Sequence, residues 1–526
     1  MNESCRYLKW KCAWSAENAV HVTGLLAYLL VVFLPVGALV LASVFSLLND
    51  PAEYFGYLIP GGRQVSLLMH SIGLSISVAV VAMVVGTLAA TFLWQTGSPL
   101  ISRLKWFFFV LAPVPPYIHA LTWVSFTDAL GISFSGWGAS FWVYLMAYLP
   151  FAVLVSLLGL RSVDSELIQA GRVYTRDIRV YSRIILPLAR STIMAGGAII
   201  FLLVMMDYSV PSLFSVNVYP LDIFAEYSAN GDSSIAFLMS VPLILPAMIL
   251  VLLAQKWIQA LSGGFSLAGK KDIINMQWPA WFSTLFYAAG ILLFIQVIIL
   301  FSSLITGTGS FLQFSSSVAA ATNEIWVTLI ICLLFAILCI PPALAVSGEL
   351  VNKKMGGNAW WLAVLLPLTL PAPLIGMGLI GLWNSQMPLI LHGNLIMPVL
   401  ALLARFTPFA VILLVAFMKS QDRLLIDASR VFSGSYLRSL QGIILPLLLP
   451  GIIGTSAVAF ALGLGELGAT LMVMPPGDAT LTMRIYNYLH YGASETVAGL
   501  SLLMTIMTAL AGIVVLYVID RYNKRV

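Results

Sequence analysis

The sequence predicts an all-α integral membrane protein whose twelve transmembrane helices form two parallel six-helix repeats. Of the 526 residues, 60% are apolar and only 9% are charged, and mean hydropathy is +0.98. Soluble domains are about 25% charged, so this composition excludes a soluble enzyme, a disordered chain and a disulfide scaffold. Twelve apolar windows each approach the roughly 20 residues that a spanning helix needs. In addition, two polar loops resemble each other at a fixed spacing.

The twelve windows follow one another with short loops between them. The third is the weakest, because Pro113, Pro115 and Pro116 interrupt it. The first is too long and too late for a cleaved signal peptide, so we expect it to be retained. The windows lie near residues 23–47, 69–95, 106–124, 139–160, 191–214, 234–257, 280–305, 322–347, 358–383, 396–418, 448–474 and 493–518.

The distribution of basic residues predicts the orientation of these helices. If both termini are cytoplasmic, the cytoplasmic segments hold 23 of the 26 Lys and Arg residues. The outer loops hold Arg63 and Arg484, and Arg405 falls within the tenth window. Cytoplasmic loops of membrane proteins carry an excess of Lys and Arg. The net charge of +5 is therefore a consequence of topology and does not by itself indicate a nucleic-acid partner.

Two charged loops indicate that the chain is duplicated. Residues 161–190 and 419–441 hold nine and six of the 47 charged residues. Ala-x-Arg-Val at 170–173 recurs at 428–431, a shift of 258, and Ile-Leu-Pro at 185–187 recurs at 444–446, a shift of 259. Each loop connects the fourth and fifth windows of its half. We therefore expect residues 1–257 and 280–526 to be two parallel halves joined by a cytoplasmic linker at 258–279.

Each loop contains a short amphipathic segment. In the first copy Leu167, Gly171 and Tyr174 share a helical face beside Arg172, and a Leu-Pro pair opens the next window,. In the second copy the face is formed by Leu424, Leu425, Ala428, Val431 and Phe432. Small residues on these segments would let another surface approach closely. Two matched copies favour a docking helix for a cytoplasmic partner over an ordinary solvated basic loop.

The loops resemble the EAA motif of membrane subunits of type I ABC importers, and the resemblance covers both halves. It is closest to the fused permeases of the ferric iron, thiamine and phosphonate group; residues 465–492 look especially like the ferric-iron type. The sequence departs from E-A-A at 169–171 and 427–429, and the motif glycine is replaced by Thr175 and Ser433. The residues that the resemblance assigns to ATPase coupling are Gln169, Ala170, Gly171, Arg172, Thr175, Asp427, Ala428, Ser429, Arg430, Ser433 and Gly434.

The resemblance implies a type I ABC importer permease fold and a translocation subunit without catalytic activity. Each loop would seat in one of two cytoplasmic ABC ATPase subunits, and a periplasmic binding protein would deliver the solute across a bacterial inner membrane. ATP and Mg²⁺ would bind the ATPase. The stretch Gly264-x4-Gly269-Lys270-Lys271 lacks the Ser or Thr of a Walker A motif,. We therefore expect no cofactor, metal or nucleic acid on this chain, and membrane lipid around it.

Three ionisable residues fall within or beside the windows. Asp207 and Glu466 each lie 20 residues after the loop proline of their half, which is about 30 Å along a helix. Charges at membrane depth are costly and often functional. The two carboxylates could face each other in a gate or contact a passing cation, or they could cap neighbouring backbone groups. Arg405 could contact an anionic substrate, although we favour pairing with a carboxylate or a helix end.

The resemblance leaves four candidate substrates. Ferric iron leads on the resemblance of residues 465–492 alone, and thiamine, a phosphonate or a polyamine are the alternatives. A secondary transporter with twelve spans would also show a six-plus-six repeat. In the common facilitator type, however, the basic loop follows the second span of each half, whereas here it follows the fourth.

Overall fold

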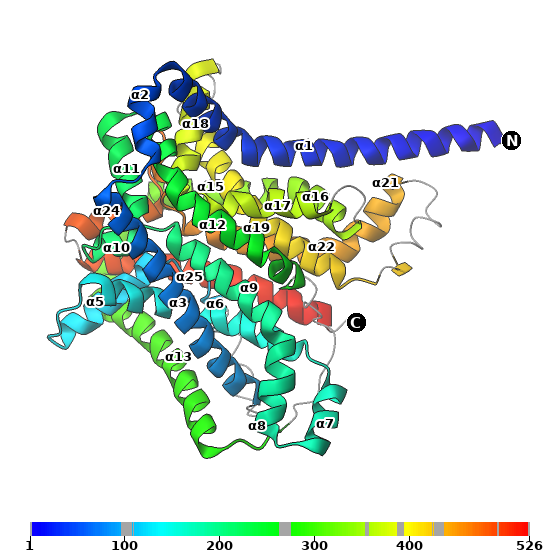
Figure 1. The fold of residues 1–526 in the computed structure, drawn as a ribbon, viewed down its shortest axis with the longest axis horizontal. Helices are drawn as coiled ribbons and strands as arrows, with labels where there is room; N and C mark the ends of the chain where they lie inside the picture. The colour runs from blue at the N-terminus through cyan, green and yellow to red at the C-terminus, as the bar shows by residue number, and fades with distance from the viewer. Residues whose placement is uncertain are drawn as a thin grey trace.

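The computed structural model describes residues 3–95, 108, 110–261, 275–352, 357–386, 394–422, 424, 425, 436–491 and 494–523. Every regular element within these residues is helical, which confirms the all-α class (Figure 1). The first half contains α1 (Glu3–Asn49), α2 (Pro51–Tyr54), η1 (Phe55–Leu58), α3 (Gly62–Gln95), α5 (Pro116–Ala129), α6 (Gly136–Arg161), α7 (Ser165–Tyr174), α8 (Asp177–Val180), η2 (Tyr181–Ile185), α9 (Leu186–Met205), α10 (Ser209–Leu213), α11 (Tyr219–Asn230) and α12 (Ser233–Leu261).

The second half repeats much of this succession. It contains α13 (Ala280–Gly307), α14 (Phe311–Ala320), α15 (Thr322–Leu338), α16 (Ile340–Asn352), α17 (Gly357–Leu365), η3 (Leu366–Thr369), α18 (Ala372–Gln386), α19 (Ile396–Lys419), α21 (Tyr436–Ser439), η5 (Leu440–Ile444), α22 (Leu445–Leu464), α23 (Thr470–Val473), α24 (Leu481–Tyr491) and α25 (Ser494–Asn523). A π-helical turn, η2 or η5, precedes the loop proline in both halves. The helix continues through Pro187 and Pro446, since Ile185 and Ile444 before α9 and α22 keep right-handed helical dihedrals, and a π-helical turn is a usual irregularity of a helix at such a point.

The described residues do not confirm the predicted count of twelve spans. Ten helices in the described residues are long and apolar enough to cross a membrane, or eleven if one bent pair is counted as a span. The bent pair replaces the ninth window: residues 358–369 and 372–382 meet at 98°. In the third window the described helix, α5, has only 14 residues, and residues 96–107 before it lie outside the described part of the chain.

Prolines account for both broken windows. Pro113 and Pro115 precede α5, and Pro371 and Pro373 stand at the bend before and within α18, at a shift of 258. Proline removes an N–H donor and clashes with the preceding turn, so it ends or bends a helix. The two breaks thus fall at equivalent positions, the third window of each half. The repeat therefore includes the prolines that interrupt this window.

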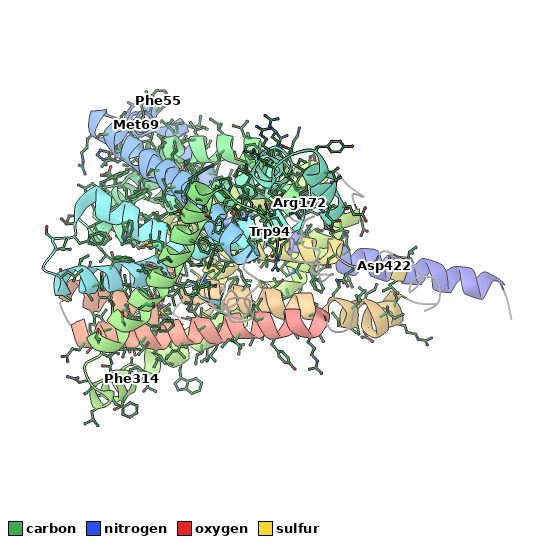
Figure 2. The ribbon with its side chains drawn as sticks, turned by 90° about the horizontal axis from the view of Figure 1, so that it is seen from below. Phe55, Met69, Trp94, Arg172, Phe314 and Asp422 are labelled. Atoms are coloured by element: carbon green, nitrogen blue, oxygen red, sulfur yellow. The ribbon has the colours of Figure 1, made fainter. Side chains whose placement is uncertain are left out.

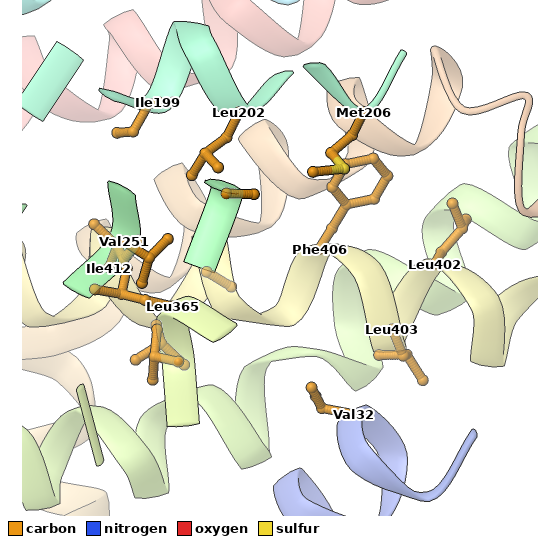
Figure 3. Packing of buried hydrophobic residues seen from close by; sticks show 14 of the residues in the cluster. Val32, Ile199, Leu202, Met206, Val251, Leu365, Leu402, Leu403, Phe406 and Ile412 are labelled. Carbon is orange, nitrogen blue, oxygen red and sulfur yellow. The ribbon is translucent and has the colours of Figure 1, made fainter. Parts of the chain in front are cut away.

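The first helix of each half packs against the opposite half. Helix α1 lies along α16 and α18 of the second half, whereas α13 lies along α3 and α5 of the first. Within each half the order of packing is the same: α3, α6, α9 and α12 correspond to α16, α19, α22 and α25. Figure 3 shows buried residues from both halves in one cluster, including Val32 of α1, Leu202 of α9, Val251 of α12 and Phe406 of α19. The two halves therefore pack together around a shared buried cluster.

The two repeated loops lie at one end of the molecule. Both chain termini, α7 and α21 are at this end in Figure 1, whereas α2, α5, α10 and α24 are at the other. In Figure 2, seen at 90°, Arg172 and Asp422 lie toward one end, and Phe55 and Phe314 lie toward the opposite end. The described residues of the two loops can therefore face the same compartment.

Candidate coupling surface and pathway cluster

Helix α7 begins and ends at clear local signals. The Asp164 side chain accepts a hydrogen bond from the Glu166 backbone N–H at 3.0 Å, which satisfies one of the unpaired donors of a helix N-terminus. Glu166 places a negative charge in the first turn, where the helix dipole favours it. The helix ends where Thr175 adopts an extended conformation. The segment that the sequence singled out is therefore a helix of 10 residues.

Three apolar side chains of α7 form an exposed tip. Leu167 is 53% exposed, Val173 80% and Tyr174 90%. Ile168, on the opposite side, is buried at 1% and belongs to the core beneath the loop. Large apolar side chains grouped on an otherwise polar loop mark an interaction site. We call Leu167, Val173 and Tyr174 the coupling surface.

Two of the predicted coupling residues contact other parts of the same chain. A Cβ on Gly171 would lie 2.6 Å from Ile184 Cδ1 and 3.4 Å from both Val180 methyl groups. The small residue thus allows the chain's own η2 to approach α7 closely. Arg172 is also engaged internally, because its Nε lies 2.9 Å and its Nη2 3.2 Å from the two oxygens of Asp177. Gln169 and Ala170 are exposed, and Thr175 is half-buried.

The second predicted segment falls mostly outside the described residues. This applies to Asp427, Ala428, Ser429, Arg430, Ser433 and Gly434. Immediately before them, Asp422 Oδ1 accepts from the Leu424 N–H at 2.9 Å, the same arrangement that begins α7. Leu424 and Leu425 are 75% and 53% exposed. The coupling role of this copy stays a prediction.

The Asp207 carboxylate lies just after α9. Its Oδ1 accepts from the Ser209 backbone N–H at 3.0 Å, and its Oδ2 accepts from the Ser209 hydroxyl and the Tyr144 hydroxyl, both at 2.9 Å. These hydrogen bonds hold the start of α10 against α6. Every donor in this set is neutral, and no cation forms an ion pair with Asp207 within the described residues. The carboxylate is half-buried.

Glu466 lies at the equivalent place after α22 and has a different partner. Its Oε2 is 2.5 Å from Arg405 Nη1, and its Oε1 accepts from the Ala469 N–H at 2.7 Å, before α23. The Glu466 side chain is 2% exposed, whereas that of Arg405 is 23% exposed and lies over the Phe406 ring at 5.2 Å. Both carboxylates therefore cap the backbone of the following short helix, and only Glu466 is matched by a cation.

Tyrosines that the sequence reasoning missed connect the two carboxylates. Tyr208 is 4% exposed, its hydroxyl has no hydrogen-bond partner, and it lies within electrostatic reach of Asp207, Glu466 and Arg405. Its ring is 3.7 Å from a Cβ built on Gly468, in the segment that follows Glu466. Tyr148 in α6 is similarly within reach of Asp207 and Arg405. We call Asp207, Tyr208, Arg405 and Glu466 the pathway cluster, because they join the equivalent points of both halves.

Comparison with known proteins finds a family match in the second half of the chain. Residues 310–526 match the family described as binding-protein-dependent transport system inner membrane component. This match assigns residues 310–526 to that family. The match covers the second half from residue 310 onward, including α19, α22 and the Arg405–Glu466 pair. In the repeat, α7 and Asp207 of the first half lie at positions equivalent to the loop and Glu466 of the matched half.

Two kinds of relatives resemble this permease. The putative 2-aminoethylphosphonate transport system permease protein PhnV of Salmonella paratyphi A is 30% identical over 183 residues, which is 34% of this chain and 66% of that protein. The protein of the same name from Salmonella typhi aligns to the same extent. The spermidine/putrescine transport system permease protein PotC of Escherichia coli K12 is 24% identical over 210 residues, 39% of this chain and 78% of that protein. All three are named as permeases and none as an enzyme.

The names of these relatives bear on the substrate expectation. None of the three is named for iron, so the ferric-iron expectation has no support from them. They match two of the alternatives, a phosphonate and a polyamine. The segment at 465–492 that resembled ferric-iron permeases contains Glu466, which the structure assigns to an internal ion pair.

Proposed function

We propose that this chain is the translocation subunit of an ATP-driven importer in a bacterial inner membrane, with both termini cytoplasmic. The observation that carries the proposal is the coupling surface on α7, at the same end of the molecule as α21 and both termini (Figure 1). A separate ATPase dimer would bind α7 and the second loop, and ATP binding would switch the pathway between inward-open and outward-open states. A periplasmic binding protein would deliver the solute to the opposite end.

We further propose that the imported solute carries a protonated amine. The substrates named for the relatives, 2-aminoethylphosphonate and spermidine or putrescine, share a primary amine. In the pathway cluster Arg405 is paired with Glu466, whereas Asp207 has only neutral donors. The cluster therefore has an excess negative charge beside the unpartnered Tyr208 hydroxyl. A carboxylate and a hydroxyl together suit an ammonium group, which has three donors and no acceptor.

The same charge balance ranks the two amine-bearing classes. A phosphonate needs a cation or several N–H donors, and the guanidinium of Arg405 is already engaged by Glu466. A polyamine needs only acceptors. We therefore propose a polyamine-like cation as the leading substrate and an aminoalkylphosphonate, which would present its amine to Asp207, as the second.

The test is purification from native membranes followed by reconstitution of the co-eluting complex into liposomes. We expect an ATPase to co-elute, and we expect uptake of labelled putrescine or spermidine that requires ATP and the cognate binding protein. Uptake of 2-aminoethylphosphonate alone would favour the second candidate. A chain that elutes without an ATPase and accumulates solute on an imposed proton gradient would instead be a secondary transporter, and the proposed function would be wrong.

A further inference from the structure

The segment just before α13 is bound to the base of α7. The Gln277 backbone N–H donates to Asp177 Oδ2 at 2.5 Å, and Arg172 Nη2 donates to the Asn275 carbonyl at 3.2 Å. The Met276 N–H donates to Gln95 Oε1 at the end of α3, at 3.1 Å. Residues 275–277 thus lie between the first repeated loop and α3. Backbone groups of this segment are thus satisfied by side chains of the loop and of α3.

Asp177 is the centre of this attachment. Its side chain is 9% exposed and receives two hydrogen bonds from Arg172 as well as the one from Gln277. A buried carboxylate is stable only when its charge is matched and its oxygens are hydrogen-bonded. Arg172 supplies the charge from α7, and the pre-α13 segment supplies an N–H. Removing any one member would therefore loosen α7 and the segment together.

Aromatic packing continues the attachment into α13. The Trp278 ring packs edge-on against the Tyr181 ring, with centroids 5.3 Å apart. Both rings also pack against the Phe282 ring, with centroid distances of 5.0 Å from Trp278 and 5.4 Å from Tyr181. The Tyr181 hydroxyl is 2.7 Å from Thr91 Oγ1 of α3. Ile168 of α7, Tyr181, Met276 and Phe282 belong to one buried cluster. The contacts run without interruption from α7 through η2 to α13.

We propose that residues 275–282 are a strap that makes α7 and α13 move as one body, with Asp177 as the positioning residue. The inference rests on the proposed docking of an ATPase on α7. Because α13 packs against α3 and α5 of the first half and also against α25 of the second, a displacement of α7 reaches both halves. The strap differs between the two loops, since Tyr436 stands at the position equivalent to Asp177 at a shift of 259. In the second loop α1, the first helix of its own half, contacts α21.

Distances between spin labels test the proposal directly. In a variant lacking the four cysteines, one label is placed at Glu166 on α7 and the other at Thr284 on α13, both exposed. A control pair joins Glu166 to Leu445, which is 41% exposed at the start of α22. We expect the first distance to be the same in the nucleotide-free and the ATP–vanadate-trapped complex, while the control distance changes. If both distances change equally, α7 and α13 move separately and the strap is disproved.

Substitutions then identify the positioning residue. Asp177→Asn and Trp278→Ala, which disturb the strap from its charged and its aromatic side, should each broaden the 166–284 distance distribution. They should lower the solute transported per ATP hydrolysed several-fold, while ATPase co-purification persists because the coupling surface is intact. Arg179→Gln, exposed in the same loop, is the control and should change neither. Wild-type distances and coupling in Asp177→Asn would overturn the assignment, whereas loss of ATPase association in the unsubstituted chain would count against the proposed function instead.

Discussion

Arg405 Nη1 lies 2.5 Å from Glu466 Oε2, and this ion pair is the main asymmetry between two otherwise equivalent pathway elements. At a shift of 258 the first half has Ala147 in place of Arg405, and Asp207 is instead held by Tyr144 and Ser209. The duplicated halves therefore keep the position of the carboxylate and its role as a backbone cap. They differ in whether its charge is cancelled.

Breaking this pair from the cationic side should destabilise the protein. Arg405→Met leaves Glu466, whose side chain is 2% exposed, without its cation; leaving a buried charge unpaired costs about 3–5 kcal/mol. Thermal unfolding of the detergent-purified protein measures the effect. The double variant Arg405→Met with Glu466→Gln should recover much of the loss, because no charge is then left unpaired. An unchanged melting temperature in the single variant would show that the pair contributes little.

Charge removal at the two carboxylates should have unequal effects on transport. Asp207→Asn should raise the KM for putrescine by about tenfold or more, since a hydrogen bond to a charged group contributes roughly 1.5–3 kcal/mol. Glu466→Gln, the matched control, should affect KM less because Arg405 already neutralises that carboxylate. The measurement is uptake into liposomes over a range of putrescine concentrations. Equal effects of the two variants, or none, would remove Asp207 from the substrate contact.

Much of this architecture can be predicted from local sequence. Apolar length predicts helices, and Leu-Pro at 186–187 and 445–446 predicts where α9 and α22 begin, because these signals act within one turn or one span. The broken third and ninth windows were also predictable, since prolines recur there at a shift of 258. The prolines marked the third window as weak, whereas the break in the ninth was missed because mean hydropathy over a window does not register a bend.

The contacts of the site could not be predicted in the same way. Arg172 and Gly171 share a helix with the coupling surface, so the pattern assigns them to the same role; only tertiary packing reveals Asp177 and Ile184 on their inner side. Likewise, the sequence does not distinguish Tyr208, which follows Asp207, from an ordinary aromatic residue at a membrane interface. Its importance depends on the opposite half, which brings Gly468 and Glu466 against it.

The exposed tip of α7 should control ATPase affinity without affecting stability. Tyr174 is 90% exposed, so Tyr174→Ala removes no internal packing, while truncation of an aromatic anchor at an interface typically costs about 2 kcal/mol or more. We expect ATPase binding, measured by co-purification and titration, to weaken by more than tenfold at an unchanged melting temperature. Arg179→Ala in the same loop is the control. Full ATPase affinity in Tyr174→Ala would place the docking surface elsewhere.

A buried polar contact between α5 and α13 should contribute modestly to stability. Gln296, 1% exposed in α13, accepts from Trp123 Nε1 at 2.9 Å and lies 2.5 Å from His119 Nδ1. Gln296→Leu leaves both partners unsatisfied, and hydrogen bonds between membrane helices contribute about 0.6 kcal/mol on average, up to ~1.7. We expect a loss of about 1 kcal/mol. Ser302→Ala, which loses only a bond within its own helix, should be nearly neutral; an equal loss there would contradict the interhelical role.

Steric fit beneath α7 should be sensitive to a single methyl group. A Cβ on Gly171 would lie 2.6 Å from Ile184 Cδ1, so Gly171→Ala must push that methyl aside or tilt α7 away from η2. Overpacking of this kind costs about 1–3 kcal/mol, and a flexible chain end places the expected cost near the lower limit. ATP-driven uptake should fall, because a tilted α7 presents its coupling surface at the wrong angle. Ile184→Val removes the Cδ1 atom itself, so the double variant should regain both stability and uptake. If the double variant is as impaired as Gly171→Ala alone, then the glycine serves the partner's surface rather than the chain's own η2.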